Sequence, residues 1–137
     1  MKTKEYKFLF VDDNQDVLDL LSVVIACEYP HAMMFLSTNN REAFEIAVTH
    51  FPDLIFSDLI RPHGNGWDLL QQLHSYSATR NIPVIVVSGF VSPSRNGFEE
   101  EERKLYRSGF NWVIGKPFTL DLLKQAAHEL LNPNKPP

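Results

Sequence analysis

Five polar residues stand at the ends of short apolar runs, and their types suit phosphate chemistry. They are Asp12, Asp13, Asp58, Ser88 and Lys116. In an open parallel α/β sheet, ligands bind beyond the carboxyl ends of the strands, so side chains at these positions are expected to meet at one rim. Three carboxylates placed together repel one another and need a compensating cation. The pattern therefore predicts a metal site with a hydroxyl and an ammonium group beside it.

The ligands in this set favour a hard divalent cation. The cluster offers oxygen atoms, and the five histidines of the chain show no metal-ligand spacing. Two or three carboxylates with room for water suit Mg²⁺ better than a closed Ca²⁺ cage, with Mn²⁺ as the expected substitute. Magnesium indicates phosphate chemistry, in which an Asp attacks phosphorus while the metal and a Lys neutralise charge and a hydroxyl binds an oxygen.

Each of the five residues also has a plain structural interpretation. Asp12 or Asp13 can cap the following helix, and Asp58 can begin a turn. Ser88 can bond to its own backbone, and Lys116 can be an ordinary surface charge. Their joint position at one sheet edge favours the metal site over these separate interpretations.

The elements that must position these residues follow from an alternation of short apolar runs with longer amphipathic segments. This pattern is typical of a parallel sheet covered by helices. The predicted strands span residues 7–11, 33–37, 54–57, 83–88 and 111–114. The predicted helices span about 15–28 and 41–50, with three more that begin near 66, 98 and 119. Expected helix caps are Asp13 or Asn14, Asn39 or Asn40, and Thr119.

Length and composition indicate one globular domain in a reducing compartment. The chain has 137 residues, of which 44% are hydrophobic and 22% charged. A net charge of -4 argues against direct binding to nucleic acid. The single cysteine, Cys27, excludes an internal disulfide and is expected to be a buried, hydrophobic thiol. The apolar run near the N-terminus is too short for a signal peptide or a membrane span, so we expect a cytoplasmic protein.

Four motifs, taken in order, resemble the receiver domain of two-component response regulators. They are Phe8-Leu-Phe-Val-Asp-Asp-Asn14, Asp58-Leu-Ile-Arg-Pro62 followed by Gly66, Val86-Val-Ser-Gly89, and Gly109 through Gly115-Lys-Pro-Phe118. The resemblance covers residues 5–131 and leaves 132–137 as a Pro-rich tail or linker stub. It implies an α/β, flavodoxin-like doubly wound sheet of five parallel strands in the order 2-1-3-4-5, with five helices.

The resemblance also implies roles for the acidic residues. Asp58 matches the residue that accepts a phosphoryl group from a sensor histidine kinase or a histidine phosphotransfer protein. Asp13 matches a direct Mg²⁺ ligand, and Asp12 a supporting acid. Asp58 itself and the backbone carbonyl of Ile60 complete the ligand set that the family implies.

Two further positions match the family's phosphate-binding and switch residues. Ser88 matches the hydroxyl that moves toward the phosphoryl oxygens, and Lys116 matches the lysine that pairs with Asp58 and then with its phosphate. The family often holds the bond before the following proline, here Lys116–Pro117, in cis. Phosphorylation then biases a surface made of the fourth helix, fifth strand and fifth helix, which a downstream protein reads. The chain is thus expected to be a signalling domain rather than an enzyme, with self-catalysed phosphotransfer and dephosphorylation only. No membrane partner is expected, and a homodimer is left open.

The sequence departs from the family pattern at the position of its switch aromatic. That aromatic usually lies three residues before the Lys-Pro lysine, where this chain has Val113. The adjacent Trp112 is expected to point to the opposite face of the strand and to be a core residue.

Two other departures lie in loops. Arg61 stands where the family commonly has Met, and its cation either modulates the phosphoryl group or faces solvent. The interval between Ser88 and Lys116 is longer than usual by several residues, which fall within 90–98.

Two other functions fit parts of this sequence. The missing aromatic and the long loop suit a receiver-like module that binds partners independently of phosphate. A Mg²⁺-dependent phosphohydrolase would need an acid or base two residues after the nucleophile, where Ile60 stands, and a capping insertion. The phosphoacceptor is the favoured interpretation.

Overall fold

The computed structural model describes residues 5–60, 64–89 and 98–132, with side chains from residue 100 onward in the last range. Within these ranges the strands form a five-stranded sheet in the order β2-β1-β3-β4-β5, and every pair is parallel. The strands are β1 (Lys7–Val11), β2 (Met33–Ser37), β3 (Leu54–Asp58), β4 (Val84–Ser88) and β5 (Trp112–Gly115).

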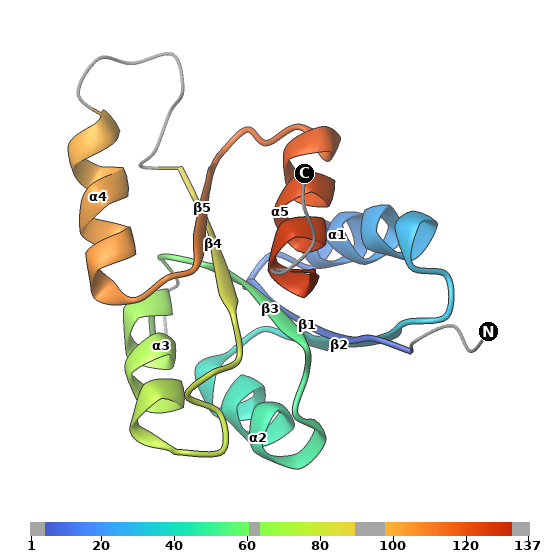
Figure 1. Ribbon diagram of the computed structural model, residues 1–137, viewed down its shortest axis with the longest axis horizontal. Coiled ribbons are helices and arrows are strands. Elements are labelled where there is room, and N and C mark those ends of the chain that lie inside the picture. Colours follow the sequence, from blue (N-terminus) through green and yellow to red (C-terminus); the bar gives the residue numbers. More distant parts are fainter. Residues whose placement is uncertain (1–4, 61–63, 90–97, 133–137) are drawn as a thin grey trace.

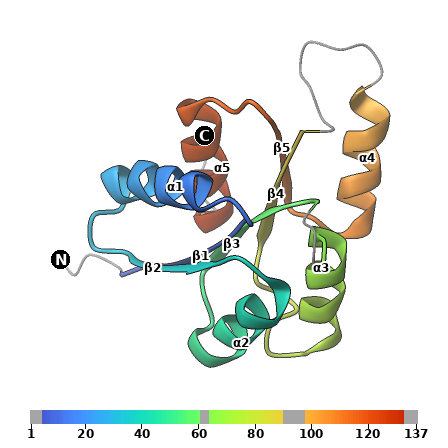
Figure 2. The same cartoon turned by 180° about the vertical axis from the view of Figure 1, so that it is seen from behind.

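Helices cover both faces of the sheet (Figures 1 and 2). They are α1 (Gln15–Glu28), α2 (Asn40–His50), α3 (Gly66–Ser75), α4 (Phe98–Ser108) and α5 (Leu120–Leu131). Helices α1 and α5 lie on one face, and α2, α3 and α4 lie on the other. This arrangement confirms the predicted doubly wound fold and its strand order. No described helix is both long enough and apolar enough to span a membrane.

The core consists of two apolar layers, one on each side of the sheet. Along β1, Phe8 and Phe10 pack toward α1 and α5, whereas Leu9 and Val11 pack toward α2 and α3. This alternation arises because successive side chains of a strand point to opposite faces. Since both faces are covered, every residue of β3 and β4 is buried. Each fully buried large side chain stabilises the fold by about 1.5–3 kcal/mol relative to an exposed one.

Strand ends differ from the prediction by one residue, and before β5 the Asn111 N–H donates to the Val84 carbonyl oxygen at 2.9 Å. Asn111, predicted as the first residue of its strand, accepts a hydrogen bond through Oδ1 from the Val84 N–H at 2.9 Å. It therefore precedes β5 as a side-chain link to β4. Asp58 belongs to β3, because it pairs in register with Val87.

Helix caps agree with the sequence. Asn14 Oδ1 accepts hydrogen bonds from the N–H groups of Asp16 at 2.9 Å and Val17 at 3.4 Å. Asn39 and Thr119 cap α2 and α5 in the same way. Such caps satisfy donors that the first helical turn leaves unpaired. The first of them also fixes the direction in which the chain leaves β1.

Cys27 is exposed, so the expectation of a buried thiol was wrong. The buried side chains of α1 are Leu18, Leu21, Val24 and Ile25. Since an α-helix turns by about 100° per residue, Cys27 lies about 200° around the axis from Ile25 and faces away from the core.

Candidate metal centre

Three carboxylates meet at the carboxyl edge of the sheet. Asp12 and Asp13 follow β1, and Asp58 ends the neighbouring β3, which pairs with β1 up to Val11 and Ser57. One carboxylate oxygen from each aspartate lies within 4.8 Å of the others. Asp12 and Asp58 are buried, with 3% and 4% of their surface exposed, whereas Asp13 is exposed. Two acids are thus fixed inside the edge, and the third borders solvent.

Both oxygens of Asp12 have partners within the protein. Oδ1 accepts a hydrogen bond from the Asn14 N–H at 2.9 Å, and Oδ2 lies 3.5 Å from Lys116 Nζ. The Lys116 side chain is 34% exposed, so its ammonium group remains accessible while it offsets part of the acidic charge. Asp12 is thus held by one backbone hydrogen bond and one ion pair at the edge of the cluster.

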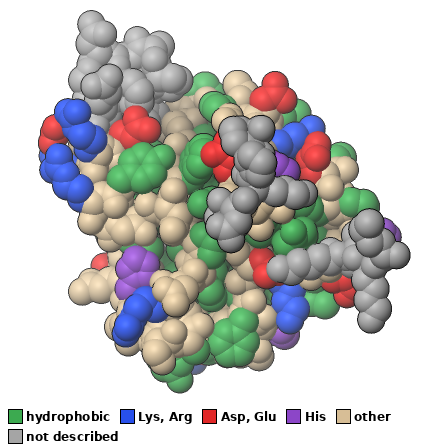
Figure 3. All heavy atoms as spheres, in the orientation of Figure 1, with side chains coloured by type: hydrophobic (Ala, Val, Ile, Leu, Met, Phe, Trp, Pro, Cys, Tyr) green, Lys and Arg blue, Asp and Glu red, His purple; other side chains and the backbone are tan. Residues whose placement is uncertain are grey.

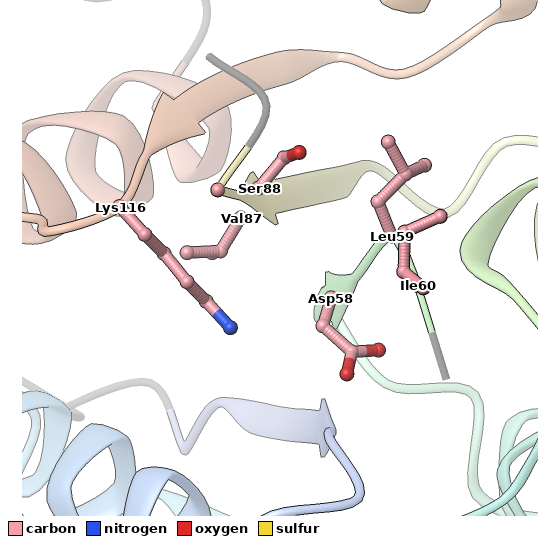
Figure 4. A pocket seen from close by; sticks show the side chains of 7 residues that line it. Asp58, Leu59, Ile60, Val87, Ser88 and Lys116 are labelled. Carbon is pink, nitrogen blue, oxygen red and sulfur yellow. The ribbon is translucent and has the colours of Figure 1, made fainter. Parts of the chain in front are cut away.

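A cavity of about 380 Å³ opens beside Asp58. Its lining comes from the ends of β3, β4 and β5, namely Asp58, Leu59, Ile60, Val87, Ser88, Gly89 and Lys116. In Figure 4, the Lys116 side chain extends from the end of β5 toward Asp58. The cavity therefore gives a ligand access to the carboxylate.

Ser88 and Lys116 are held together by the backbone. Ser88 pairs in register with Gly115, and the Lys116 N–H donates to the Ser88 carbonyl oxygen at 2.8 Å. The Lys116–Pro117 peptide bond is cis, as the family resemblance implies. The structure thus places the predicted hydroxyl and ammonium residues on adjacent strand ends.

The backbone after Asp58 is packed closely against the start of α3. The Gly66 N–H donates to the Leu59 carbonyl oxygen at 2.7 Å, and Ser57 Oγ donates to the Asp58 carbonyl oxygen at 2.8 Å. A Cβ atom added at Gly66 would lie 2.5 Å from the Asp58 carbonyl oxygen. Only glycine fits at this position without movement of the main chain that carries Asp58.

Gly66→Ala is therefore expected to destabilise the protein by about 1–3 kcal/mol, as overpacked positions usually do. The measurement is the free energy of unfolding in urea. Gly89→Ala is the matched control, since a Cβ there would meet no atom of the described residues within 4 Å. Equal stability of the two variants would contradict the close approach.

Val113, which stands at the family's switch-aromatic position, and the adjacent Trp112 lie on opposite faces of β5. Val113 is buried, with 8% of its surface exposed, in the layer beneath α2, α3 and α4. Trp112 is half-buried against the layer that contains α1 and α5. The expected opposite face of Trp112 is confirmed, and its ring packs against the core as a partly buried residue. Arg61 and the loop 90–97 lie outside the described residues.

Sequence reasoning missed two contributors, Gly66 as a contact of the Asp58 backbone and Tyr106 of α4. The Tyr106 hydroxyl accepts a hydrogen bond from the Val113 N–H at 3.1 Å. Burial raises the pKa of Tyr106 and the nearby Glu102 adds to this rise, while the hydrogen bond from Val113 lowers it. Neither contact has a sequence signature, because each joins a helix to a strand end.

The carboxylate oxygens of this cluster are chemically suited to bind Mg²⁺. Three carboxylates from two strand ends lie together, with no histidine or cysteine in the group, and hard oxygen donors are the ligands that this ion prefers. The exposed position of Asp13 leaves room for the water molecules that Mg²⁺ usually retains.

Comparison with known proteins agrees with this architecture. A relative from Leptolyngbya boryana, an uncharacterized 14.6 kDa protein, is 28% identical over 109 residues, which are 80% of this chain and 77% of the relative. A probable cyclic di-GMP phosphodiesterase from Vibrio cholerae is 28% identical over 120 residues, but these cover 88% of this chain and only 25% of that protein.

Structural comparison gives the same fold. The signal receiver domain of a DNA-binding response regulator from Colwellia psychrerythraea superposes with a TM-score of 0.81 at 23% identity, over 93% of this chain and 99% of that one. Residues 8–128 match the family described as the response regulator receiver domain. The chain therefore belongs to the family of response regulator receiver domains.

Proposed function

We propose that this receiver domain accepts a phosphoryl group on Asp58 in a Mg²⁺-dependent reaction and thereby switches a protein-interaction surface. The donor is a phosphohistidine of a sensor histidine kinase or of a histidine phosphotransfer protein. The observation that carries the proposal is the cluster of Asp12, Asp13 and Asp58 beside an open cavity that Lys116 also lines.

The chemistry is a transfer between two nucleophiles. A carboxylate oxygen of Asp58 attacks phosphorus and forms an O–P bond, while the N–P bond to the donor imidazole breaks and its electron pair stays on nitrogen. Mg²⁺, held by Asp13, Asp58 and the Ile60 carbonyl oxygen with Asp12 in support, supplies positive charge for the phosphoryl oxygens. Mn²⁺ is expected to serve as a substitute.

The remaining site residues act on the charge of the transferred group. Lys116 extends toward Asp58 and can neutralise a phosphoryl oxygen, and the Ser88 hydroxyl can donate a hydrogen bond to another. Ile60 carries a hydrocarbon side chain, 54% exposed, where a hydrolase would place an acid or base. This supports a phosphoacceptor with only slow, self-catalysed dephosphorylation rather than an enzyme that turns over free substrates.

The output of this proposal is a downstream protein that reads the face of α4, β5 and α5. The proposal includes no contact with nucleic acid, because a net charge of -4 repels the negatively charged phosphate backbone. A cytoplasmic location is included, in keeping with the single cysteine.

Intact-mass measurement of the protein tests the proposal. The protein is incubated with acetyl phosphate or phosphoramidate, with and without Mg²⁺. We expect one phosphoryl adduct that requires the metal. If folded protein gives no adduct and does not bind beryllofluoride, a mimic of the phosphoryl group, the proposal is wrong and the phosphate-independent binding module takes its place.

A further inference from the structure

Among the described side chains of helix α4, two adjacent ones, Leu105 and Tyr106, join it to the sheet and its core. Among its described side chains, residues 100–108, Leu105 alone is buried, with 2% of its surface exposed. The next residue, Tyr106, is 42% exposed and holds the Val113 N–H through its hydroxyl oxygen. Charged side chains of both signs gather on the exposed surface of α4 (Figure 3). The helix thus has a narrow contact with the sheet.

The bond from Val113 satisfies a donor at the edge of the sheet. β5 is the last strand, with β4 on one side only. Alternate N–H groups of an edge strand point away from their neighbour and are left unpaired unless another element covers them. α4 lies beside β5 in Figures 1 and 2, and Tyr106 provides this cover.

On its other side, α4 borders unfilled apolar space. A cavity of about 290 Å³ lies between α3 and α4, lined by Leu59, Trp67, Glu101, Lys104 and Leu105. The pocket is open at the surface, with exposed Trp67, Glu101 and Lys104 in its lining, so α4 is not packed closely against α3 along this stretch. The bond between Tyr106 and Val113 is the directional contact that opposes a shift of α4.

Both anchors of α4 touch residues that adjoin the acidic site. Leu105 packs in the same cluster as Leu59, which directly follows Asp58. Val113 lies on β5, which Lys116 directly follows, and the Lys116 N–H donates to the Ser88 carbonyl oxygen. Backbone and hydrogen bonds thus form a continuous connection from Ser88 and Lys116 through β5 to the Tyr106 hydroxyl.

We propose that Tyr106 is a positioning residue that holds α4 against β5 while Asp58 is unmodified, and that phosphorylation of Asp58 is coupled to the loss of this bond. The inference rests on the proposed function and assigns the coupling to one hydroxyl group. By linkage, a contact that stabilises the unmodified arrangement weakens binding at Asp58, and its removal strengthens that binding by the same factor.

Tyr106→Phe tests this coupling, because it removes the hydroxyl and keeps the ring. The measurement is the affinity for beryllofluoride in the presence of Mg²⁺, followed by NMR together with the Val113 amide resonance. A neutral hydrogen bond of ordinary strength corresponds to a change of about two- to tenfold. We expect Tyr106→Phe to bind beryllofluoride tighter by about this factor. In the wild-type protein, we expect exchange of the Val113 amide to become faster when the mimic binds.

Tyr76→Phe is the matched control. Tyr76 ends α3, is 52% exposed, and packs its ring edge-on against Phe44, away from β5. The Tyr76→Phe variant should bind beryllofluoride with the affinity of the wild type. If Tyr106→Phe bound beryllofluoride no more tightly than the wild type, even with faster exchange of the Val113 amide, the bond would be purely structural. This outcome would overturn the coupling and leave the proposed function standing. Failure of the folded wild type to bind would overturn the proposed function, and the coupling with it.

Discussion

Replacement of Asp58 by Asn is expected to reduce phosphoryl incorporation to background, a loss on the order of 100-fold or more. The amide is nearly isosteric with the carboxylate, but it lacks the negative charge and the nucleophilic oxygen. The side chain is 4% exposed and lies with two other carboxylates, so the neutral amide also relieves repulsion inside the edge. The variant should therefore remain folded while it loses the reaction.

The measurement is intact mass after incubation with Mg²⁺ and acetyl phosphate. Asp19→Asn is the matched control, because Asp19 lies on the exposed side of α1 and accepts a hydrogen bond from Gln15. It should give the full adduct. An Asp58→Asn protein that gained one phosphoryl group as completely as the wild type would assign the acceptor to another residue.

Replacement of Asp13 by Ala is expected to raise the Mg²⁺ concentration needed for half-maximal phosphorylation. Removal of a residue that only hydrogen-bonds to a metal ligand weakens metal binding by about 10- to 100-fold. Removal of a direct ligand should have at least this effect. Asp13 is the exposed member of the cluster, so its removal leaves no buried cavity. Without metal, the variant should unfold at a higher temperature than the wild type, because one of three repelling charges is gone.

A titration of the phosphorylation rate with Mg²⁺, together with thermal unfolding in EDTA, measures both effects. Asp16→Ala serves as the control, since it removes an exposed carboxylate from the first turn of α1, the helix that follows Asp13. Its Mg²⁺ requirement should stay close to that of the wild type. An identical Mg²⁺ requirement in Asp13→Ala would exclude Asp13 as a ligand.

Local pattern in the sequence determined the sheet, the helices and the place of the acidic site. β3 and β4 begin as apolar runs because both faces of a parallel sheet are covered, and such runs are readable without a structure. The carboxyl ends of parallel strands share one edge, so Asp12, Asp13 and Asp58 had to come together once the strands were recognised. Asn14, Asn39 and Thr119 mark helix starts through bonds to their own neighbours in sequence.

Tertiary structure alone decided how helices rotate and which groups meet across elements. The ion pair of Lys116 with Asp12, the approach of Gly66 to the Asp58 carbonyl and the bond from Val113 to Tyr106 each join residues of different elements or of the loops that follow them. The exposure of Cys27 depends on which stripe of α1 faces the core. These features depend on packing geometry that no short pattern encodes, because the relative positions of two elements are set by all the side chains between them.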